Sequence, residues 1–337
     1  MNKRIKFRIR NIIILCLIVA ITIAIFAAFH FNSKVKDTAN TIHTSINRGK
    51  SKFRPSAVSI NKHAPISIAL FGVDSNTKRL ATGDAGRSDS IILLSINPQK
   101  NSSVMISIPR DTYSKIVGHN THEKINRAYN YGGAKMAVDS VEQLMNVPID
   151  YYATINMDGI REMIDAVGGV DVISNATFEY EGNQFIQDQE AHLDGKKALS
   201  FIRSRKQEGA GGDFGRQERQ QIVIQALADK LLSIQSVSKL DAILKTIERN
   251  VVTDITFDDI KTLKSNYSKS LNSVEKYQLS GSGQFLNDNL WYFIPNLEEK
   301  NRVQNAYLKN LGLQEQPLEK DSYEFPAIEV QTSEYQY

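Results

Sequence analysis

An uncharged apolar run near the N-terminus constrains this chain more than any other feature. Residues 12–31 contain no Lys, Arg, Asp or Glu, and twenty such residues form a helix long enough to cross a bilayer. Five of the first ten residues are basic and none is acidic. Because basic flanks remain in the cytoplasm, we predict a cytoplasmic segment at 1–11, a transmembrane signal-anchor helix at 12–31 and an extracellular remainder. The chain is therefore expected to be a single-pass type II protein of the cell membrane.

A cleaved signal peptide is the alternative interpretation of this run. Its apolar region would normally be shorter, and no good small-x-small cleavage site follows residue 31. Cys16 is the one cysteine of the 337 residues and lies inside the run, so the extracellular part has no cysteine for a disulfide. Secreted eukaryotic domains more often carry several disulfides, which favours a bacterial cell-surface protein.

Composition divides the extracellular part into three regions. Residues 32–64 are polar and basic without a sustained apolar period, which predicts an extracellular stalk. Residues 65–315 contain the apolar segments of one folded domain, without a composition break strong enough to split it. Residues 316–337 are acidic and aromatic, and we expect this C-terminal tail to be disordered.

Apolar periodicity predicts strands that alternate with helices. The runs at 66–71, 90–96 and 103–108 are short, apolar and ended by Gly, Asn-Pro or Pro, as buried strands are. Further strands are expected at 151–155, 170–173, 275–279 and 290–293. Helical spacing of apolar residues predicts helices at 134–145, 158–167, 195–203, 216–234, 239–249 and 258–267. This alternation is typical of an α/β fold.

Charged residues stand at the ends of the first three predicted strands. Asp74 follows the first strand and Asp89 precedes the second, and two carboxylates at neighbouring strand ends can share one Mg²⁺ ion near phosphates. Arg110 projects from the end of the third strand, where open α/β sheets place ligands. The structural alternatives are ordinary ion pairs, between Asp89 and Arg87 at a solvated turn and between Arg110 and Asp111.

A polar loop downstream carries His119, His122 and Lys124. A zinc site would need further ligands at metal-binding spacing, and the sequence places none near the two histidines. Lys124 is an additional, unspecific candidate for a cation that binds phosphate.

The strongest chemical signal is a cluster of cations around a glycine-rich turn between residues 203 and 220. Guanidinium groups match phosphate oxygens two at a time, and a helix N-terminus adds unpaired N–H groups. Arg216, Arg219 and Gln220 share one face at the start of the predicted helix, which Asp213 is expected to cap. Cations at this position oppose the helix dipole, and a bound anion would explain their placement. The cluster consists of four arginines, Arg203, Arg205, Arg216 and Arg219, together with the neutral amide of Gln220.

Two other interpretations of this cluster stay open. It can be a solvated basic loop, or it can bind acidic polymer without specificity. Nucleic acid is excluded as a partner, because an extracellular domain seldom meets it and the interleaved aromatic residues of single-strand binders are missing.

Six short motifs, in this order and approximate spacing, resemble the LytR-CpsA-Psr family of cell-wall proteins. They are Gly72-Val-Asp74, Arg87-Ser-Asp89-Ser90, Pro109-Arg110-Asp111, Lys124-Ile-Asn126, Arg203-Ser-Arg205 and Gly215-Arg216-x-x-Arg219-Gln220. The resemblance implies a mixed central β-sheet flanked by helices, with an apolar groove for a polyprenyl chain. The short cytoplasmic segment, single anchor and stalk also fit this family.

The resemblance also implies an activity. Members transfer anionic glycopolymers, such as teichoic acid or capsular polysaccharide, from an undecaprenyl-pyrophosphate carrier to peptidoglycan in Gram-positive bacteria. The chain is then expected to be a Mg²⁺-dependent phosphotransferase, with pyrophosphatase as a side activity. We expect the acceptor to be the 6-hydroxyl of N-acetylmuramic acid.

The roles of individual residues are carried over by motif. Asp74 and Asp89 correspond to the Mg²⁺ ligands, and Asp111 is expected to orient its neighbours. Asp89, Arg110 and Arg216 correspond to the catalytic residues. The residues expected to bind the pyrophosphate are Arg87, Arg110, Lys124, Arg203, Arg205, Arg216, Arg219 and Gln220.

Two functions without catalysis are the alternatives. The first is a membrane-anchored regulator of wall-related gene expression, although about eleven cytoplasmic residues cannot form a DNA-reading helix module. The second is an extracellular module that binds lipid carrier or wall polymer without turnover. Metal-dependent release of phosphate or of polymer-linked peptidoglycan separates an enzyme from a binding protein.

Overall fold

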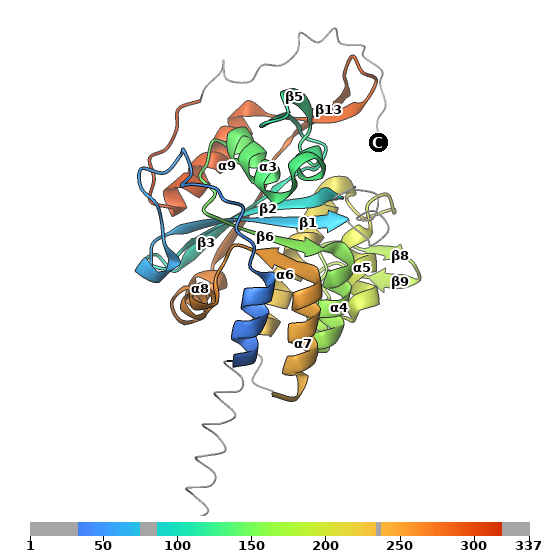
Figure 1. Cartoon of the computed structure of the whole chain (residues 1–337). Helices are drawn as coiled ribbons and strands as arrows, with labels where there is room; N and C mark the ends of the chain where they lie inside the picture. Colours follow the sequence, from blue (N-terminus) through green and yellow to red (C-terminus); the bar gives the residue numbers. More distant parts are fainter. Residues whose placement is uncertain (1–32, 75–85, 234–236, 319–337) are drawn as a thin grey trace, which may run out of the picture.

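The computed structural model describes residues 33–74, 86–233 and 237–318, and within them the fold centres on a six-stranded mixed sheet (Figure 1). The strand order is β11–β6–β1–β2–β3–β12. β2 is antiparallel to both β1 and β3, whereas β6 is parallel to β1 and β12 is parallel to β3. The bounds are β1 (Ile66–Asp74), β2 (Arg87–Asn97), β3 (Ser102–Ile108), β6 (Tyr151–Asn156), β11 (Val251–Thr253) and β12 (Val274–Gln278). The three apolar runs are thus three neighbouring strands, and the expected α/β fold with a mixed sheet is confirmed.

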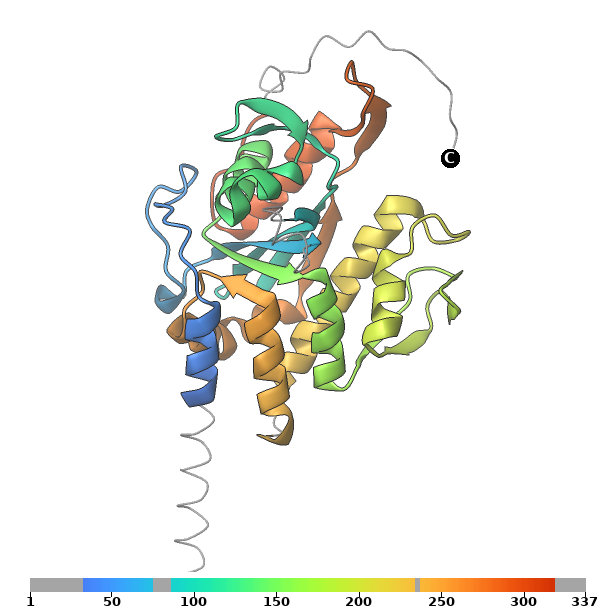
Figure 2. The same cartoon turned by 45° about the vertical axis from the view of Figure 1, so that its right-hand side comes forward.

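Helices cover both faces of the sheet (Figures 1 and 2). Both faces are covered because successive side chains of β1 point to opposite faces of the sheet. Phe71 packs in a core with residues of α3 and α9, and Ile68 packs on the other face in a core with residues of α6 and α8. The helices are α3 (Arg127–Met145), α4 (Met157–Val167), α5 (Gly195–Arg203), α6 (Gly212–Ser233), α7 (Val237–Asn250), α8 (Phe257–Thr262) and α9 (Leu297–Asn310). Short helical turns also occur before β1 at η1 (Ile60–Lys62) and after α8 at η2 (Leu263–Tyr267) and η3 (Ser268–Asn272).

Four two-stranded ribbons surround these layers. Two of the eight strands coincide with predicted ones, at 170–173 and 290–293, and the others were not predicted. The ribbons pair β4 (Tyr113–Ile116) with β5 (Thr121–Lys124), β7 (Val170–Ile173) with β10 (Glu190–Leu193), β8 (Phe178–Tyr180) with β9 (Asn183–Phe185), and β13 (Gly281–Phe285) with β14 (Trp291–Pro295). The β13–β14 hairpin projects from the end of the molecule opposite α7 (Figures 1 and 2).

Residues 33–64 belong to the folded body rather than to the separate stalk that their composition predicts. Residues 33–42 are helical and lie beside α7, where Lys34 Nζ is 2.6 Å from Asp241 Oδ1 and Thr38 donates a 2.6 Å hydrogen bond to Glu248. Contacts with residues about 200 positions away cannot be read from local composition.

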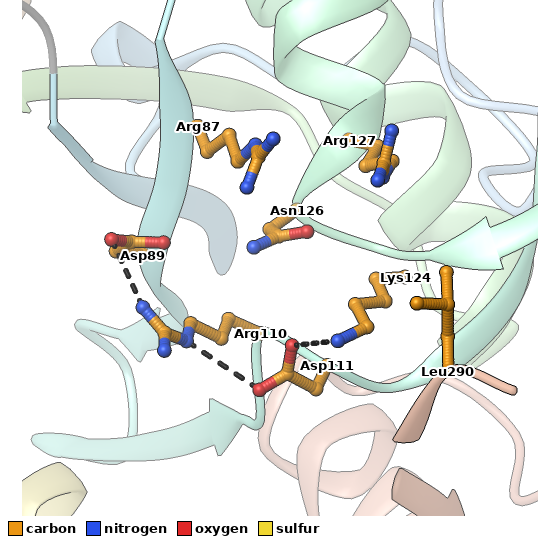
Figure 3. Close-up of a pocket in the computed structure, with 8 residues that line it drawn as sticks. All are labelled: Arg87, Asp89, Arg110, Asp111, Lys124, Asn126, Arg127 and Leu290. Carbon is orange, nitrogen blue, oxygen red and sulfur yellow. Dashed lines mark ion pairs between the residues drawn. The ribbon is translucent and has the colours of Figure 1, made fainter. Parts of the chain in front are cut away.

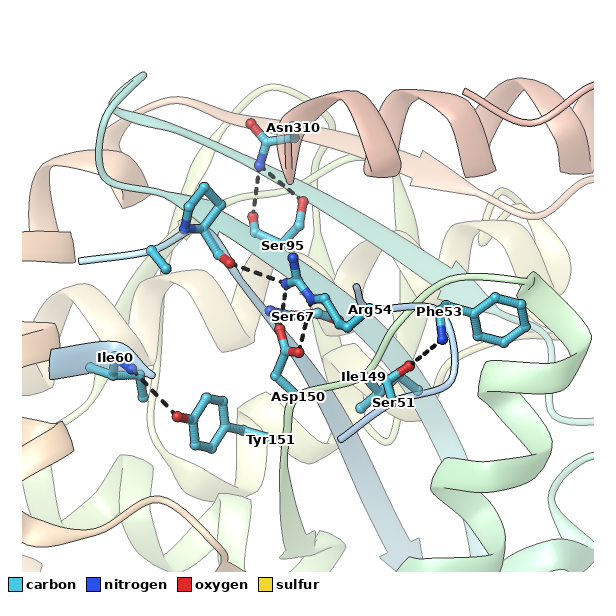
Figure 4. A network of polar contacts seen from close by, with 12 residues as sticks. Ser51, Phe53, Arg54, Ile60, Ser67, Ser95, Ile149, Asp150, Tyr151 and Asn310 are labelled. Atoms are coloured by element: carbon cyan, nitrogen blue, oxygen red, sulfur yellow. Dashed lines mark hydrogen bonds and ion pairs between the residues drawn. The ribbon is translucent and has the colours of Figure 1, made fainter. Parts of the chain in front are cut away.

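The segment after this helix is fixed to the sheet by a buried ion pair (Figure 4). The side chain of Arg54 is 6% exposed, and its Nε donates a 3.0 Å hydrogen bond to Asp150 Oδ1. Arg54 also donates to the carbonyl of Pro65, and Asp150 accepts from the backbone N–H of Ser67 at the start of β1. Ile60 is fully buried in the core beneath the sheet. These contacts make the segment part of the domain.

The predicted anchor and most of the predicted tail fall outside the described residues. Within the ranges that the structure describes, no helix combines the length and the hydropathy that crossing a membrane requires. Residues 1–11, 12–31 and 319–337 are not among those ranges, so the cytoplasmic segment, the anchor and the disordered tail stay predictions.

Candidate active site

A β-bulge near the start of β2 directs Asp89 away from the regular ladder. Gly72 pairs with Ser90 and Val73 pairs with Ser88, so the register between β1 and β2 skips Asp89. A residue skipped in this way is left unpaired and its strand bends, and such bulges are frequent beside active sites. The ladder ends at the pair formed by Asp74 and Arg87. Asp89 and Arg87 are therefore both presented at one edge of the sheet.

Three strand ends meet at this edge, as the sequence predicts. β2 begins where its antiparallel neighbours β1 and β3 end, which brings Asp89 close to Arg110 and Asp111 after β3. These side chains and others from the segment between β5 and α3 surround a cavity of about 230 Å³, which we call the edge pocket (Figure 3). It is lined by Arg87, Asp89, Arg110, Asp111, Lys124, Asn126, Arg127 and Leu290.

Ion pairs fix the cations of the edge pocket (Figure 3). Arg110 Nη1 lies 3.1 Å from Asp89 Oδ2, and Arg110 Nε lies 3.5 Å from Asp111 Oδ2. Lys124 Nζ lies 3.0 Å from Asp111 Oδ1 and 5.7 Å from the centre of the Tyr292 ring. Asp111 therefore contacts two cations, in agreement with the expectation that it orients its neighbours.

A second group of cations lies next to Arg110, at the N-terminus of α6. Arg216 Nη2 is 2.8 Å from Asp213 Oδ1, and Arg205 Nη1 is 3.5 Å from the same oxygen. The prediction that Asp213 caps α6 is wrong, because the helix already begins at Gly212 and Asp213 lies in its first turn. Its carboxylate instead divides its charge between two arginines. We call Arg110, Arg205 and Arg216 the arginine cluster.

The pKa values of two members of the arginine cluster are perturbed in opposite directions. Burial acts to lower the pKa of Arg110, but the carboxylates of Asp89 and Asp111 outweigh it and raise this pKa. Burial lowers the pKa of Arg216, the charges of Arg110 and Arg205 lower it further, and Asp213 offsets these effects in part. The Arg216 side chain is only 12% exposed, so water screens this repulsion poorly. An added anion would relieve it.

Arg219 does not belong to the anion site, contrary to the prediction. Its side chain is fully buried and donates hydrogen bonds to the carbonyls of Phe201 and Ser204 and to Asn175 Oδ1, at 2.9, 2.7 and 3.2 Å. The guanidinium carbon lies 4.6 Å from the centre of the Phe178 ring. Arg219 therefore joins α6 to α5 and to the β8–β9 hairpin, which is a structural role.

Gln220 and Arg203 are not among the residues that line the edge pocket. Gln220 is buried one turn along α6 from Arg216 and lines a narrow apolar cavity of about 30 Å³ between α6 and the sheet. That cavity is lined by Leu70, Phe71, Gly72, Ser90, Ile92, Ile155, Ile160, Ile202, Gln220, Val223 and Ile224. Arg203 is exposed in the last turn of α5, where a cation complements the helix dipole.

The oxygen atoms at the edge pocket fit a Mg²⁺ ion that is shared with substrate. Mg²⁺ is usually held by one or two carboxylates together with substrate phosphates. Asp89 lines the edge pocket, and buried Asn126 Oδ1 has no hydrogen-bond partner in the described structure. The backbone of Asp74 ends β1 opposite Arg87, while its side chain lies outside what the structure describes. Among the described residues, no three His, Cys, Asp or Glu side chains are grouped to hold a metal.

Three residues of the edge pocket, Asn126, Arg127 and Leu290, have no role in the prediction. Asn126 stands in a motif that carries the resemblance, and Arg127 follows it as the first residue of α3. Arg127 Nε is 3.1 Å from Glu123 Oε2, and its hydrogen bond with Tyr131 is the main reason that its pKa is raised. The predicted helix begins at 134 because Gly132 and Gly133 have non-helical backbone angles and divide α3 into two pieces, of which the first, with Arg127, was not predicted.

The fold and site together define a class of protein. It is an α/β protein with a cationic pocket at the edge of its sheet and a narrow apolar cavity beside it. The chain belongs to the LytR_cpsA_psr family, whose family model matches residues 29–309. The resemblance seen in the sequence is therefore confirmed.

Known relatives support this assignment along most of the chain. The polyisoprenyl-teichoic acid–peptidoglycan teichoic acid transferase TagU of Bacillus subtilis strain 168 is 41% identical over 265 residues, which are 79% of this chain and 84% of that protein. The TagU of Halalkalibacterium halodurans is 39% identical over 295 residues, 87% of this chain and 95% of that protein.

Solved structures agree with these similarities. The crystal structure of B. subtilis TagU matches with a TM-score of 0.61 and 35% identity, and covers 75% of this chain and 100% of that one. The structure of TagT bound to LIIa-WTA matches with a TM-score of 0.65 and 28% identity, and covers 80% of this chain and 100% of that one.

Proposed function

We propose that this chain transfers an anionic wall glycopolymer of the teichoic acid class from an undecaprenyl-pyrophosphate carrier to peptidoglycan. The relatives named above are transferases of polyisoprenyl-linked teichoic acid to peptidoglycan, and they resemble this chain over most of its length. Capsular polysaccharide is the other polymer that the same chemistry accommodates.

The arginine cluster is the observation that carries this proposal. Arg216 is largely shielded from solvent and repelled by Arg110 and Arg205, and the carboxylate nearest to it, Asp213, is shared with Arg205. Such an arrangement costs stability unless a ligand brings negative charge. Guanidinium groups bind phosphate oxygens in pairs, so a pyrophosphate is the anion that suits this cluster.

The reaction that suits these residues is a displacement at phosphorus. The 6-hydroxyl oxygen of N-acetylmuramic acid forms a bond to the phosphorus next to the glycopolymer, the bond from that phosphorus to the bridging oxygen breaks, and undecaprenyl phosphate leaves. Phosphoryl transfer depends mainly on positioning and on neutralising charge on the phosphate oxygens. Arg110 and Arg216 would supply this neutralisation.

Asp89 is our candidate for the base that accepts the hydroxyl proton. The bulge presents its carboxylate in the edge pocket, and Arg110 at 3.1 Å orients it. Asp74 and Asp89 are the residues that would hold Mg²⁺, and the ion would add positive charge at the phosphate oxygens. When the acceptor is water instead of a sugar hydroxyl, the same arrangement would act as a pyrophosphatase.

The apolar cavity lined by Gln220 is our candidate for the start of the lipid site. It lies next to the arginine cluster, because Gln220 is one turn of α6, about 6 Å, from Arg216. A cavity of about 30 Å³ holds roughly two waters and is too narrow for an isoprenoid chain. The cavity must therefore widen before the chain of the carrier can enter. A lipid-linked carrier stays in the membrane, which agrees with a proposed anchor at 12–31 and a site outside the cytoplasmic membrane.

The test is turnover of a purified polyprenyl-pyrophosphate-linked teichoic acid precursor by the full-length protein in detergent, with glycan strands as acceptor. We expect Arg216→Ala and Arg110→Ala to lower kcat/KM by at least about a hundredfold, because each removes a cation from the phosphate site. Arg302→Ala is the matched control, since Arg302 is a surface arginine paired with Glu299 far from the edge pocket.

Metal dependence is measured in the same assay. Removal of divalent cations with EDTA should abolish transfer, and Mg²⁺ should restore it. Wild-type turnover by the Arg216→Ala protein would rule out the arginine cluster as the phosphate site. Full turnover in EDTA would rule out the proposed role of Mg²⁺.

A further inference from the structure

Three exposed apolar residues belong to the β13–β14 hairpin: two are paired across its strands and one lies beside its turn. Phe285 is 63% exposed, Leu290 is 43% exposed and Trp291 is 37% exposed. A single exposed apolar residue is common on protein surfaces, but a group of them rimmed by polar residues marks an interaction site. The turn between the two strands supplies that rim with Asn287, Asp288 and Asn289. We call Phe285, Leu290 and Trp291 the hairpin platform.

Contacts within the hairpin hold this platform in one shape. Phe285 and Trp291 are directly paired across the two strands, so their side chains share one face. Trp291 lies against Gly283, where a Cβ atom would come within 2.2 Å of the indole. Asp288 accepts hydrogen bonds from the backbone N–H of Leu290 and from the hydroxyl of Tyr292, at 2.9 and 2.6 Å. The exposed rings are therefore preorganised rather than loosely attached.

The platform adjoins the edge pocket. Leu290, the residue before Trp291 in the chain, lines that pocket (Figure 3). The backbone N–H of Phe293 donates a 2.9 Å hydrogen bond to the carbonyl of Asp111, which fixes the base of β14 beside the pocket. Trp291 is two residues further along the strand, about 7 Å from that point. A polymer chain that reaches the edge pocket from this side would pass over the platform.

We propose that the hairpin platform binds the acceptor glycan strand. Sugar rings present C–H groups on one face, which pack on an aromatic ring and remove apolar surface from water, while their hydroxyl and acetamido groups bond to polar side chains at the rim. Aromatic rings flanked by Asn287 and Asn289 offer this combination. The inference rests on the proposed function, because the acceptor must bring its hydroxyl to the phosphate in the edge pocket.

A lipid surface is the other class of partner that exposed aromatic residues fit. The position of the hairpin argues against it. The helical residues 33–42, which lead from the predicted anchor, lie at one end of the molecule, and the hairpin projects from the opposite end (Figures 1 and 2). The platform then faces away from the membrane that the anchor would enter.

Intrinsic fluorescence tests the platform directly, because Trp291 is the single tryptophan of the chain. Soluble strands of alternating N-acetylglucosamine and N-acetylmuramic acid are titrated into the full-length protein in detergent, without lipid carrier. We expect a saturable shift of the emission to shorter wavelength, and a dissociation constant at least about tenfold higher for Phe285→Ala. Ile173→Ala is the matched control, since Ile173 is 62% exposed on β7 and outside the platform.

Transfer kinetics then link the platform to the reaction. Trp291→Ala and Phe285→Ala should raise the KM for glycan strands at least about tenfold and leave the affinity for the lipid-pyrophosphate donor unchanged within about twofold. An unchanged KM for glycan strands in both variants would overturn the proposal that the platform binds the acceptor, even if wild-type transfer is fast. Glycan binding by a wild type that transfers nothing would support the platform and refute the proposed function. An emission shift with anionic lipid vesicles, and none with glycan strands, would overturn the proposal, because the partner of the platform would then be a lipid surface.

Discussion

The structure predicts opposite consequences for two neighbouring arginines of α6. Arg219 is fully buried and makes three hydrogen bonds, whereas Arg216 lies in the arginine cluster with a single carboxylate at 2.8 Å. We expect Arg219→Ala to destabilise the fold and spare the affinity for pyrophosphate. Arg216→Ala should spare the fold and remove that affinity.

The magnitude for Arg219 follows from its contacts. Three hydrogen bonds contribute about 3–5 kcal/mol in total, and the contact with the ring of Phe178 adds about 1 kcal/mol. Burial lowers the pKa of Arg219 to about 10, and this cost of burying the charge, roughly 3 kcal/mol, is recovered when the side chain is removed. Truncation also leaves a cavity and removes the Arg219 donor from the carbonyl of Ser204, while the carbonyl of Phe201 keeps its hydrogen bond from the Ser204 hydroxyl. The net loss for Arg219→Ala is then about 2–4 kcal/mol.

The expected change for Arg216 is much smaller. Its removal ends the repulsion from Arg110 and Arg205 and leaves Asp213 paired with Arg205. The free energy of unfolding should therefore change by no more than about 1 kcal/mol. Affinity for a soluble pyrophosphate such as geranyl pyrophosphate should fall at least about tenfold, since one charged hydrogen-bond donor is lost.

Urea unfolding at pH 7, followed by the emission of Trp291, measures stability, and calorimetric titration measures pyrophosphate affinity. Both are made on the same protein preparations at a temperature where every variant is folded. An Arg219→Ala protein with wild-type stability and lost affinity would refute this reasoning, because Arg219 would then be a ligand of the phosphate.

Three further predictions concern stability and the hairpin. Arg54→Ala should lower the free energy of unfolding by about 3–5 kcal/mol, because it leaves Asp150 buried and unpaired, and urea unfolding measures this. Burial raises the pKa of Asp254 to about 6, so its contribution to stability is present below about pH 4 and is lost as the pH rises through 6. Asp254→Asn should therefore match the wild type at pH 4 and exceed it by about 1–3 kcal/mol at pH 8 in urea unfolding. Gly283→Ala should displace the indole of Trp291 and shift its emission towards that of free tryptophan.

Each of these predictions has its own control and its own contrary result. Arg249→Ala, at an exposed ion pair, should change stability by no more than about 1 kcal/mol, and an equal loss in both arginine variants would contradict the role of the buried pair. Parallel stability curves for wild type and Asp254→Asn across pH 4–8 would show that Asp254 does not titrate in this range. Gly49→Ala is the control for the hairpin, because a Cβ there meets nothing within 4 Å.

The sequence predicts those parts of the fold that depend on local pattern. The strands β1, β2 and β3 are continuous apolar runs because both of their faces are buried, and α5 has the predicted bounds because Asp194 caps it by accepting from the N–H of Lys197. The helix α9 was missed because Lys300, Gln304 and Asn310 are polar and nevertheless buried, which interrupts the apolar period. The partners of Gln304 and Asn310 lie far away in the chain, at Asn146 and Ser95.

In the candidate site too, local pattern predicts some features, and contacts between distant segments determine the others. The strand ends that carry Asp89 and Arg110 follow from the positions of the apolar runs, and the structure brings both residues into one pocket. The i, i+3 spacing of Arg216 and Arg219 correctly predicts one helix face, but it contains no information about what packs against that face. Arg219 packs on the ring of Phe178, about 40 residues earlier in the chain, and therefore has a structural role instead of the predicted role as a ligand of phosphate.

The packing of residues 33–64 would fix how far the domain stands from a membrane that residues 12–31 cross, as proposed. A flexible stalk of 33 residues would have a root-mean-square reach of about 30 Å and would let the domain tumble. The ten helical residues 33–42 span about 15 Å and already pack against α7, and Arg54 fixes the segment that follows them to the sheet. With residues 12–31 in a bilayer, as proposed, the edge pocket would be held at one height and in one orientation. A substrate whose lipid tail stays in the same bilayer would then meet the site by diffusing in two dimensions, without a search in the third.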